Sequence, residues 1–265
     1  MKKNNFIDKG KDFSKKLNVD LVKDMLFLEI IDSTNSKAKE LAKKDAIEGT
    51  VVISEIQKNG RGRFNRRWES PRGGLYLSII LRPKVKPEKS TLLPLIGALC
   101  VCETITSISD LNAKIKWPND VLINGKKVSG ILLESESCKD KLKYVVLGIG
   151  INLNIEIFSL SDELQFNSTT ISNEIGIKLN YYDFLKKLLL NLDKYYNYFC
   201  KKKFDTIIKQ WKRNSNTIGR KVTIDTSNEK LIGNAIDIDE SGFLIIKTDV
   251  GKIKKITTGD CIYLE

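Results

Sequence analysis

The sequence predicts an α+β protein with a mostly antiparallel sheet and flanking helices, followed by a small all-β barrel. Three observations support this fold class. Strand-like and helix-periodic segments alternate before Gly219. The dipeptide Asn124-Gly125, a strong type I′ turn signal, joins two strand segments as a hairpin. Five short strand segments follow Gly219, which is typical of a small barrel.

The first half of the larger domain is expected to supply three strands and two helices. Asp32, Ser33, Thr34 and Asn35 are N-cap residue types, and they precede a helix through about Lys44. A long apolar helix is expected over residues 91–109, with a proline in its first turn. The β-branched strand segments span residues 25–31, 50–56 and 75–81.

The second half continues the sheet and then turns helical. Pro118 separates two short strands, 114–117 and 121–123, and the hairpin returns as a strand from 126 to about 137. An apolar strand over 143–153 completes a central antiparallel sheet. The expected helices span residues 169–175, 181–200 and 204–214.

A change of texture near residues 215–219 indicates a domain boundary. The pattern predicts a short amino-terminal extension (1–24), a larger domain (25–215) and a small domain (216–265). Within the extension only a short amphipathic stretch near 17–25 is expected, too short for a three-helix DNA-reading module. The strands of the small domain are expected at 221–225, 231–238, 242–248, 252–256 and 261–264.

Composition limits the class of protein. The net charge of +12 favours anionic partners, but the lysines are scattered, as on a solvated surface. Five cysteines without a CxxC pair indicate a reduced cytoplasmic protein, with Cys100 and Cys102 as buried apolar side chains. No stretch is expected to reach the 18 apolar residues of a membrane span.

The sequence contains no histidine. This absence excludes a Ser-His-Asp triad, a histidine general base, an HExxH zinc site and a zinc deaminase centre. An enzyme with this composition has to work by charge neutralisation and positioning. Phosphoryl or nucleotidyl transfer fits that requirement.

The segment 57–71 carries the strongest functional signal. It places Gly60 and Gly62 among four arginines and ends near Trp68. Glycine permits close backbone approach, arginine binds carboxylate or phosphate with two parallel hydrogen bonds, and tryptophan offers a face for stacking. An anionic ligand with an aromatic ring suits this combination, although Gly-Arg-Gly-Arg alone is weak and also occurs in RNA-binding tracts.

Four motifs in order make the signal specific: Asp32-Ser-Thr-Asn35; Gln57 with 60–68; Lys116-Trp-Pro-Asn-Asp120 with Lys127-Val-Ser-Gly-Ile-Leu132; and Gly148-Ile-Gly-Ile-Asn152. With them the chain resembles biotin protein ligases, which activate biotin as its adenylate and pass it to a lysine of a carrier protein. The resemblance covers nearly everything after residue 25. It implies a class II synthetase-like biotin/ATP-binding catalytic domain, an SH3-like barrel, and a form without an amino-terminal DNA-binding domain.

The resemblance assigns two catalytic cations, Arg61 and Lys127, which neutralise and align the biotin carboxylate and the α-phosphate. Without the motif, Lys127 is better explained as an exposed strand lysine. The implied biotin-binding residues are Ser33, Thr34, Asn35, Gln57, Gly60, Arg61, Gly62, Arg63, Lys127 and Gly130. Helix capping alone also explains the serine, threonine and asparagine of this group, and the two roles can coexist.

The implied nucleotide-binding residues are Arg63, Arg66, Trp68, Lys116, Asn119, Asp120 and Asn152, and Asp120 is the candidate ligand of Mg²⁺. An Asx turn explains Asn119 and Asp120 about equally well. A core anchor is the alternative for Trp68. Gly148 and Gly150 are expected to permit close backbone approach within the sheet.

One letter departs from the family, because Asn65 stands where a second glycine is usual. Asparagine tolerates left-handed geometry, so the turn is expected to survive. The resemblance further implies ATP, biotin and Mg²⁺, a biotin carboxyl carrier protein as partner, and a homodimer. Lipoate or octanoate ligation is the alternative enzyme reaction, and a biotin-responsive DNA-binding regulator is the disfavoured non-enzyme alternative.

Overall fold

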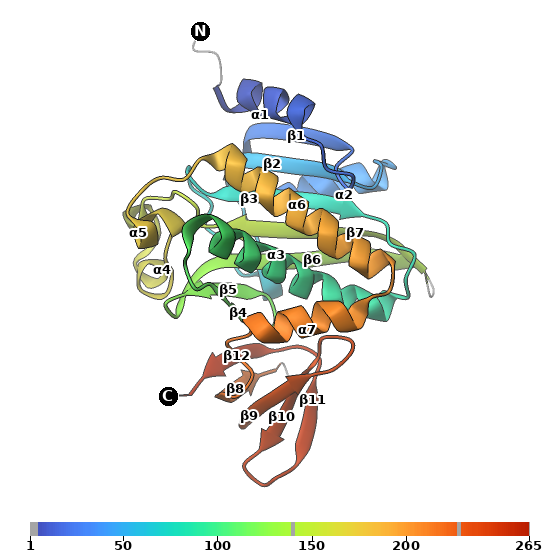
Figure 1. Ribbon diagram of the computed structural model, residues 1–265, viewed down its shortest axis with the longest axis vertical. Helices are drawn as coiled ribbons and strands as arrows, with labels where there is room; N and C mark the ends of the chain where they lie inside the picture. Colours follow the sequence, from blue (N-terminus) through green and yellow to red (C-terminus); the bar gives the residue numbers. More distant parts are fainter. Residues whose placement is uncertain (1–4, 139–140, 227–228, 265) are drawn as a thin grey trace.

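The computed structural model describes residues 5–138, 141–226 and 229–264, in which two sheets and their helices form a larger and a smaller domain (Figure 1). The larger sheet has the order β1-β2-β3-β7-β6-β5-β4. Only β1 and β2 are parallel neighbours, so the predicted mostly antiparallel sheet is confirmed. Its strands are β1 (Asp24–Ile31), β2 (Thr50–Gln57), β3 (Leu75–Leu81), β4 (Lys114–Lys116), β5 (Asp120–Ile123), β6 (Lys126–Cys138) and β7 (Lys141–Ile151).

Helix α2 (Thr34–Lys43) makes the crossover that the parallel β1–β2 pair requires. Its predicted cap is confirmed: Ser33 has extended backbone geometry, and its Oγ accepts from Ser36 N at 3.4 Å. The helix buries Ala38 and Ala42 against β2, β3 and β7. Its amino terminus therefore points along one face of the central strands.

Helices α3 (Leu92–Ser109), α6 (Tyr181–Cys200) and α7 (Phe204–Asn214) cover the opposite face of the sheet (Figure 1). Helix α3 lies between β6 and α6, which explains why it is apolar on every side. The segment 87–109 is consequently long and apolar enough to cross a membrane, which corrects the expectation that no stretch approaches that length. Two thirds of an apolar 18-residue stretch of this segment is buried inside the molecule, as in the core helix of a soluble protein.

The amino-terminal region differs from the prediction. Helix α1 (Asn5–Lys16) lies before the expected amphipathic stretch, and it packs on β1. The ring of Phe6 meets Phe27 edge to face at 5.8 Å. A Cβ on Gly10 would lie 2.4 Å from the Phe27 ring, so glycine permits this close approach. The apolar positions of α1 are sparse among lysines, and the helix gains its order from the contact with the sheet.

Short elements account for the other differences. Helix α4 (Asp162–Asn167) was not predicted, because six residues carry no readable periodicity. Helix α5 (Ile171–Ile175) and the hairpin turn were predicted correctly. Asn124 and Gly125 have φ of 50° and 79°, as a type I′ turn requires. Three 3₁₀ segments were also not predicted: η1 (Arg63–Asn65), η2 (Pro87–Thr91) and η3 (Ile157–Ser159).

The smaller domain contains the five predicted strands as an antiparallel sheet of order β11-β10-β9-β8-β12. They are β8 (Lys221–Asp225), β9 (Lys230–Ile238), β10 (Leu244–Thr248), β11 (Ile253–Ile256) and β12 (Asp260–Tyr263). Trp117, only 2% exposed, joins the two domains. Its Nε1 donates to Gly242 O at 3.0 Å, and its backbone N donates to Thr217 Oγ1 at 2.9 Å.

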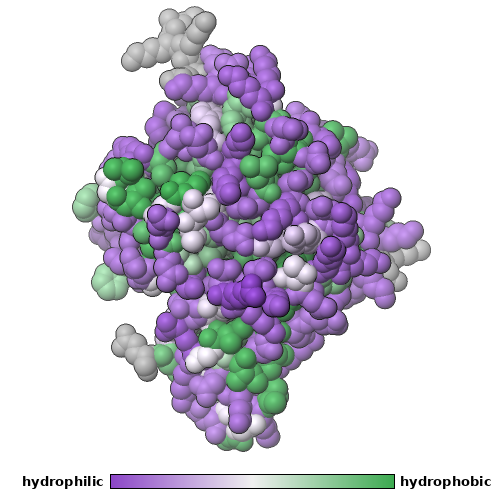
Figure 2. All heavy atoms as spheres, in the orientation of Figure 1, coloured by the Kyte–Doolittle hydropathy of each residue, from purple (hydrophilic) through white to green (hydrophobic). Residues whose placement is uncertain are grey.

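Hydrophilic residues are spread over the visible face of both domains (Figure 2). Many of the lysines pair with nearby carboxylates on the surface, as Lys143 does with Glu136 and Lys221 with Asp249. This distribution agrees with the interpretation of the net charge as a solvated surface.

Two buried tryptophans allow a test of the domain junction. Trp117→Phe should lower the free energy of unfolding by about 1–2 kcal/mol more than Trp211→Phe, because it leaves the Gly242 carbonyl without its donor. Trp211 is the matched control, since its buried Nε1 has no hydrogen-bond partner in the described chain. Urea unfolding followed by circular dichroism measures the difference. Equal losses in the two variants would contradict this role of the Trp117 bond.

Candidate active site

A cavity of about 220 Å³ opens where the amino terminus of α2, the Gly/Arg loop (residues 57–71) and strands β6 and β7 meet. Leu77, Ile131 and Ile149 give it apolar walls. All of the predicted site residues except Gly60 and Lys116 line it. The cavity also takes residues that the sequence did not indicate, including Leu160, Leu164 and Asp260.

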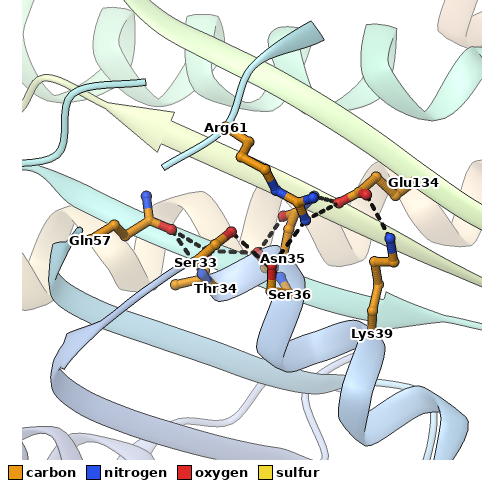
Figure 3. Close-up of polar contacts among 9 residues, drawn as sticks. Ser33, Thr34, Asn35, Ser36, Lys39, Gln57, Arg61 and Glu134 are labelled. Carbon is orange, nitrogen blue, oxygen red and sulfur yellow. Dashed lines mark hydrogen bonds and ion pairs between the residues drawn. The ribbon is translucent and has the colours of Figure 1, made fainter. Parts of the chain in front are cut away.

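Hydrogen bonds link three of the predicted biotin-binding side chains, Thr34, Asn35 and Gln57, into a continuous polar chain on one side of the cavity (Figure 3). Thr34 donates to Gln57 Oε1 from its backbone N at 2.8 Å and from its hydroxyl at 3.1 Å. Ser78 Oγ lies 2.8 Å from Thr34 Oγ1 and 2.5 Å from Asn35 Oδ1. Gln57 Nε2 then donates to Ser70 Oγ at 2.9 Å. The residues at the amino terminus of α2 therefore both begin the helix and carry candidate binding side chains.

Glu134 on β6 extends this chain to the Gly/Arg loop (Figure 3). Its Oε2 accepts from Asn35 Nδ2 at 3.0 Å and from Arg61 Nη2 at 3.1 Å, and its Oε1 pairs with Lys39 at 2.8 Å. Glu134 was not among the residues predicted from the sequence. A signal existed, since Glu134 lies two positions after Leu132 and alternation places both on one face of the strand.

The charge of Glu134 is stabilised by its partners. Burial opposes the charged form, but hydrogen bonds from Lys39 and Asn35 and the charge of Arg61 outweigh it and lower the pKa of the Glu134 carboxyl. A carboxyl with a lowered pKa in the folded chain stabilises the fold above its unfolded pKa and loses that contribution as the pH falls through the folded value. The network is therefore charged and intact at neutral pH.

The middle of the Gly/Arg loop contacts the smaller domain. Arg66 forms an ion pair with Asp260. Arg63 donates to Gly259 O at 3.1 Å, to Thr258 Oγ1 at 3.2 Å and to Asn119 Oδ1 at 3.3 Å. The two arginines assigned to the nucleotide thus contact residues 258–260 in this structure.

The turn between these arginines has two left-handed residues. Asn65 has φ of 58°, so the tolerance expected of asparagine is used. Phe64 also has a positive φ, 53°, which bulky side chains rarely adopt. The guanidinium of Arg63 lies 4.7 Å from the Phe64 ring centroid, and that of Arg66 lies 5.7 Å away. These cation–π contacts offset part of the backbone strain.

Trp68 lines the cavity, and its ring packs closely against Gly130 of β6 and Gly150 of β7. A Cβ on Gly150 would lie 2.6 Å from Trp68 Nε1, and one on Gly130 would lie 3.0 Å from the ring. A Cβ on Gly148 would lie 2.0 Å from Asn35 Oδ1. Gly148 and Gly150 were expected to permit close approach of the backbone within the sheet. The groups that approach them are instead side chains of the site, Asn35 at Gly148 and Trp68 at Gly150.

Lys127 and Asp120 form the second ion pair of the cavity, at 2.7 Å. Nζ of Lys127 also lies 5.5 Å from the Trp68 ring centroid. Among the described residues, no group of three or more His, Cys, Asp or Glu side chains could hold a metal ion. Asp120 is the acidic residue that stands beside Lys127.

Three predicted residues have a different environment from the one expected. Nζ of Lys116 lies 4.9 Å from the Tyr263 ring in the smaller domain, outside the cavity, because strand alternation turns it away. Gly60 supports the loop through its carbonyl, which accepts from Trp68 N at 2.9 Å. Asn152 lines the cavity, but its Nδ2 is engaged by Thr169 O at 3.1 Å.

Both the sequence and the structure of this chain are similar to those of known proteins. Residues 27–152 match the biotin/lipoate A/B protein ligase family, and residues 217–263 match the biotin protein ligase C-terminal domain. The chain is 37% identical to the bifunctional ligase/repressor BirA of Bacillus subtilis, over 89% of this chain and 73% of the relative. The chain belongs to the biotin protein ligase family. The ligase is therefore an enzyme, and attachment of lipoate or octanoate is not favoured.

Two further relatives cover nearly the whole ligase. A biotin–[acetyl-CoA-carboxylase] ligase of Paracoccus denitrificans is 30% identical over 83% of this chain and 93% of the relative. The structure of a biotin protein ligase from Aquifex aeolicus in complex with biotin and ATP has a TM-score of 0.77 at 30% identity, covering 91% of this chain and 99% of that one. The predicted α+β class is confirmed by this match.

Asp260 allows a test of the contact between the loop and the smaller domain. Asp260→Asn should make the segment 61–67 exchange its amide hydrogens faster, because Arg66 loses its ionic partner. Overall stability should change by less than about 1 kcal/mol, since the Arg66 side chain of this pair is largely exposed. Asp249→Asn, which breaks the exposed Lys221 pair in the same domain, is the control. Unchanged exchange in Asp260→Asn would argue against the contact.

Proposed function

We propose that the ligase forms biotinyl-AMP in the described cavity and transfers biotin to a lysine of a biotin carboxyl carrier protein. A biotin carboxylate oxygen bonds to the α-phosphorus of ATP, and pyrophosphate leaves. The lysine amine then attacks the biotinyl carbonyl, so that an amide forms, AMP leaves and the amine loses a proton. The observation that supports this reaction is the convergence of Arg61 and Lys127 on one cavity. Both substrates are anions, and two cations can bring them together.

Each of these cations is paired with a carboxylate of the chain itself. Arg61 lies beside Glu134, and Lys127 lies beside Asp120. Opposite charges at such distances attract strongly where water is partly excluded. The cations are thus held at the cavity before substrate enters, and a substrate anion meets donors that are already oriented.

Biotin fits the part of the cavity near α2. Its ureido head needs donors and acceptors, and Asn35 keeps one N–H and one lone pair beyond its bonds to Glu134 and Ser78. The Ser33 hydroxyl, whose oxygen accepts from Ser36 N, keeps its hydrogen for donation. The apolar walls at Leu77, Ile131 and Ile149 suit the hydrocarbon part of the ligand.

The nucleotide is assigned to the opposite part, beside Arg63, Arg66, Trp68 and Asn119. Mg²⁺ usually binds one or two carboxylates together with substrate phosphates, rather than a closed protein cage. Asp120 supplies one carboxylate on the cavity wall beside the residues assigned to the nucleotide, so the residues present fit such an ion. The ion would reduce the repulsion between the phosphates and the incoming carboxylate.

We assign the enzyme to the cytoplasm as a homodimer without sequence-specific DNA binding, and we assign the three domain ranges 1–24, 25–215 and 216–265. Salt-sensitive binding to one DNA sequence would contradict the part that concerns DNA.

Incubation with ATP, Mg²⁺, biotin and a biotin carboxyl carrier domain tests the reaction. One lysine on an exposed hairpin of the carrier should gain biotin, as measured by intact mass. Lipoate in place of biotin should give no product. Failure of transfer at every carrier and metal concentration would contradict the proposed function.

Lys127→Ala should reduce pyrophosphate release in the presence of biotin to background, because the charge beside the reacting anions is lost. The folded fraction measured by circular dichroism should remain that of wild type. Lys126→Ala is the matched control, since Lys126 is the adjacent residue of β6 and is exposed. Near-wild-type release by Lys127→Ala would exclude the assigned catalytic role.

A further inference from the structure

Glu134 contacts two of the candidate biotin-binding residues, Asn35 and Arg61, but does not itself line the cavity. Figure 3 shows its carboxylate in contact with Arg61 of the loop and with Asn35 and Lys39 of α2. Its side chain is 21% exposed, and within the described chain it lies behind the cavity lining rather than in it. Any effect of Glu134 on a ligand therefore acts through its neighbours.

The first neighbour is Asn35, whose amide could in principle face either way. Ser78 lies against Oδ1 at 2.5 Å, and Glu134 accepts from Nδ2 at 3.0 Å, so one orientation satisfies both ends. Gly148 leaves the space in which this buried amide fits. Without the carboxylate, Nδ2 loses its acceptor and the orientation of the amide is no longer fixed at that end.

The second neighbour is Arg61. Its Nη2 donates to Glu134 Oε2 at 3.1 Å and to Ser36 Oγ at 3.0 Å. Arginine has a long side chain with a high rotamer entropy, and this one is 36% exposed. Ser36 alone is a neutral partner, whereas Glu134 adds a charge-assisted bond that limits the guanidinium to one position.

A carboxylate is specifically suited to this place, because its three partners are all donors: Lys39 Nζ, Asn35 Nδ2 and Arg61 Nη2. Glutamine has nearly the same shape, but one of its two terminal groups is itself a donor. In either orientation its amide would point N–H hydrogens at a donor. Glu134→Gln therefore disturbs the contacts of this carboxylate without removing side-chain volume.

We propose that Glu134 is a positioning residue of the ligase, which fixes the guanidinium of Arg61 and the amide of Asn35 in the one arrangement that receives biotin. This inference rests on the proposed function. It predicts that Glu134 affects kcat through Arg61 and the KM for biotin through Asn35. A residue that only stabilised the fold would change the fraction of active enzyme and leave KM unaltered.

The experiment measures pyrophosphate release against biotin concentration for wild type and four variants. Glu134→Gln should lower kcat/KM for biotin by about tenfold to a hundredfold, as expected from a small displacement of a reacting group. Glu136→Gln is the matched control: it lies on the same strand and accepts from Lys143 and Tyr144, each at 3.0 Å. Its kcat/KM should stay within about twofold of wild type, since neither partner touches the cavity.

Arg61→Ala and the double variant Arg61→Ala/Glu134→Gln complete the set. In the Arg61→Ala background, Glu134→Gln should no longer lower kcat, whereas its effect on KM through Asn35 should persist. Thermal melting establishes that each variant is folded. If Glu134→Gln does not fold, Glu134→Asp, which keeps the charge on a shorter side chain, is expected to fold and to show the same raised KM.

The outcomes separate the two proposals. Wild type that releases no pyrophosphate with biotin and ATP overturns the proposed function. Active wild type with equal kinetics for the Glu134 and Glu136 variants overturns only the positioning role. An unchanged loss of kcat in the Arg61→Ala background also overturns it, because Glu134 would then not act through Arg61.

Discussion

Ser78 is fully buried between Thr34 and Asn35, and a hydroxyl without access to water must find hydrogen-bond partners in the chain. This requirement determines much of the site. It draws the amino terminus of α2 onto β3, and it leaves Asn35 only one orientation in which Glu134 can also accept. Glu134 then accepts from Arg61. The buried hydroxyl of Ser78 is thus linked through Asn35 and Glu134 to the Gly/Arg loop. The need of a buried hydroxyl for hydrogen-bond partners therefore also helps to order the Gly/Arg loop.

Most elements of the fold were predicted from short-range patterns in the sequence. The N-cap at Ser33 and the Asn124-Gly125 turn are short-range effects, and both were predicted from a few letters. Helix α1 was missed because its order depends on Phe27 and Tyr181, which are distant in sequence. Trp117, at the junction of the two domains, was noticed only as part of a motif, although its indole donates a hydrogen bond to the smaller domain.

The site shows the same limit more sharply. Motif positions identified which residues gather at the cavity, and nearly all of them do. Motifs could not tell that Lys116 turns toward Tyr263, because a three-residue strand leaves its direction to the fold. They also missed Glu134 and Asp260, whose importance comes from partners between 73 and 194 positions away along the chain. Such contacts follow from topology, and no local pattern encodes them.

The hold of residues 258–260 on Arg63 and Arg66 has a thermodynamic consequence for the whole molecule. Both arginines line the cavity, so any ligand that binds their guanidinium groups there must compete with the smaller domain for them. Because coupling free energies are reciprocal, a partner that occupied residues 258–260 would change the affinity for that ligand by the same factor as the ligand changed the affinity for the partner. The smaller domain would in that case be coupled to the cavity through two guanidinium groups.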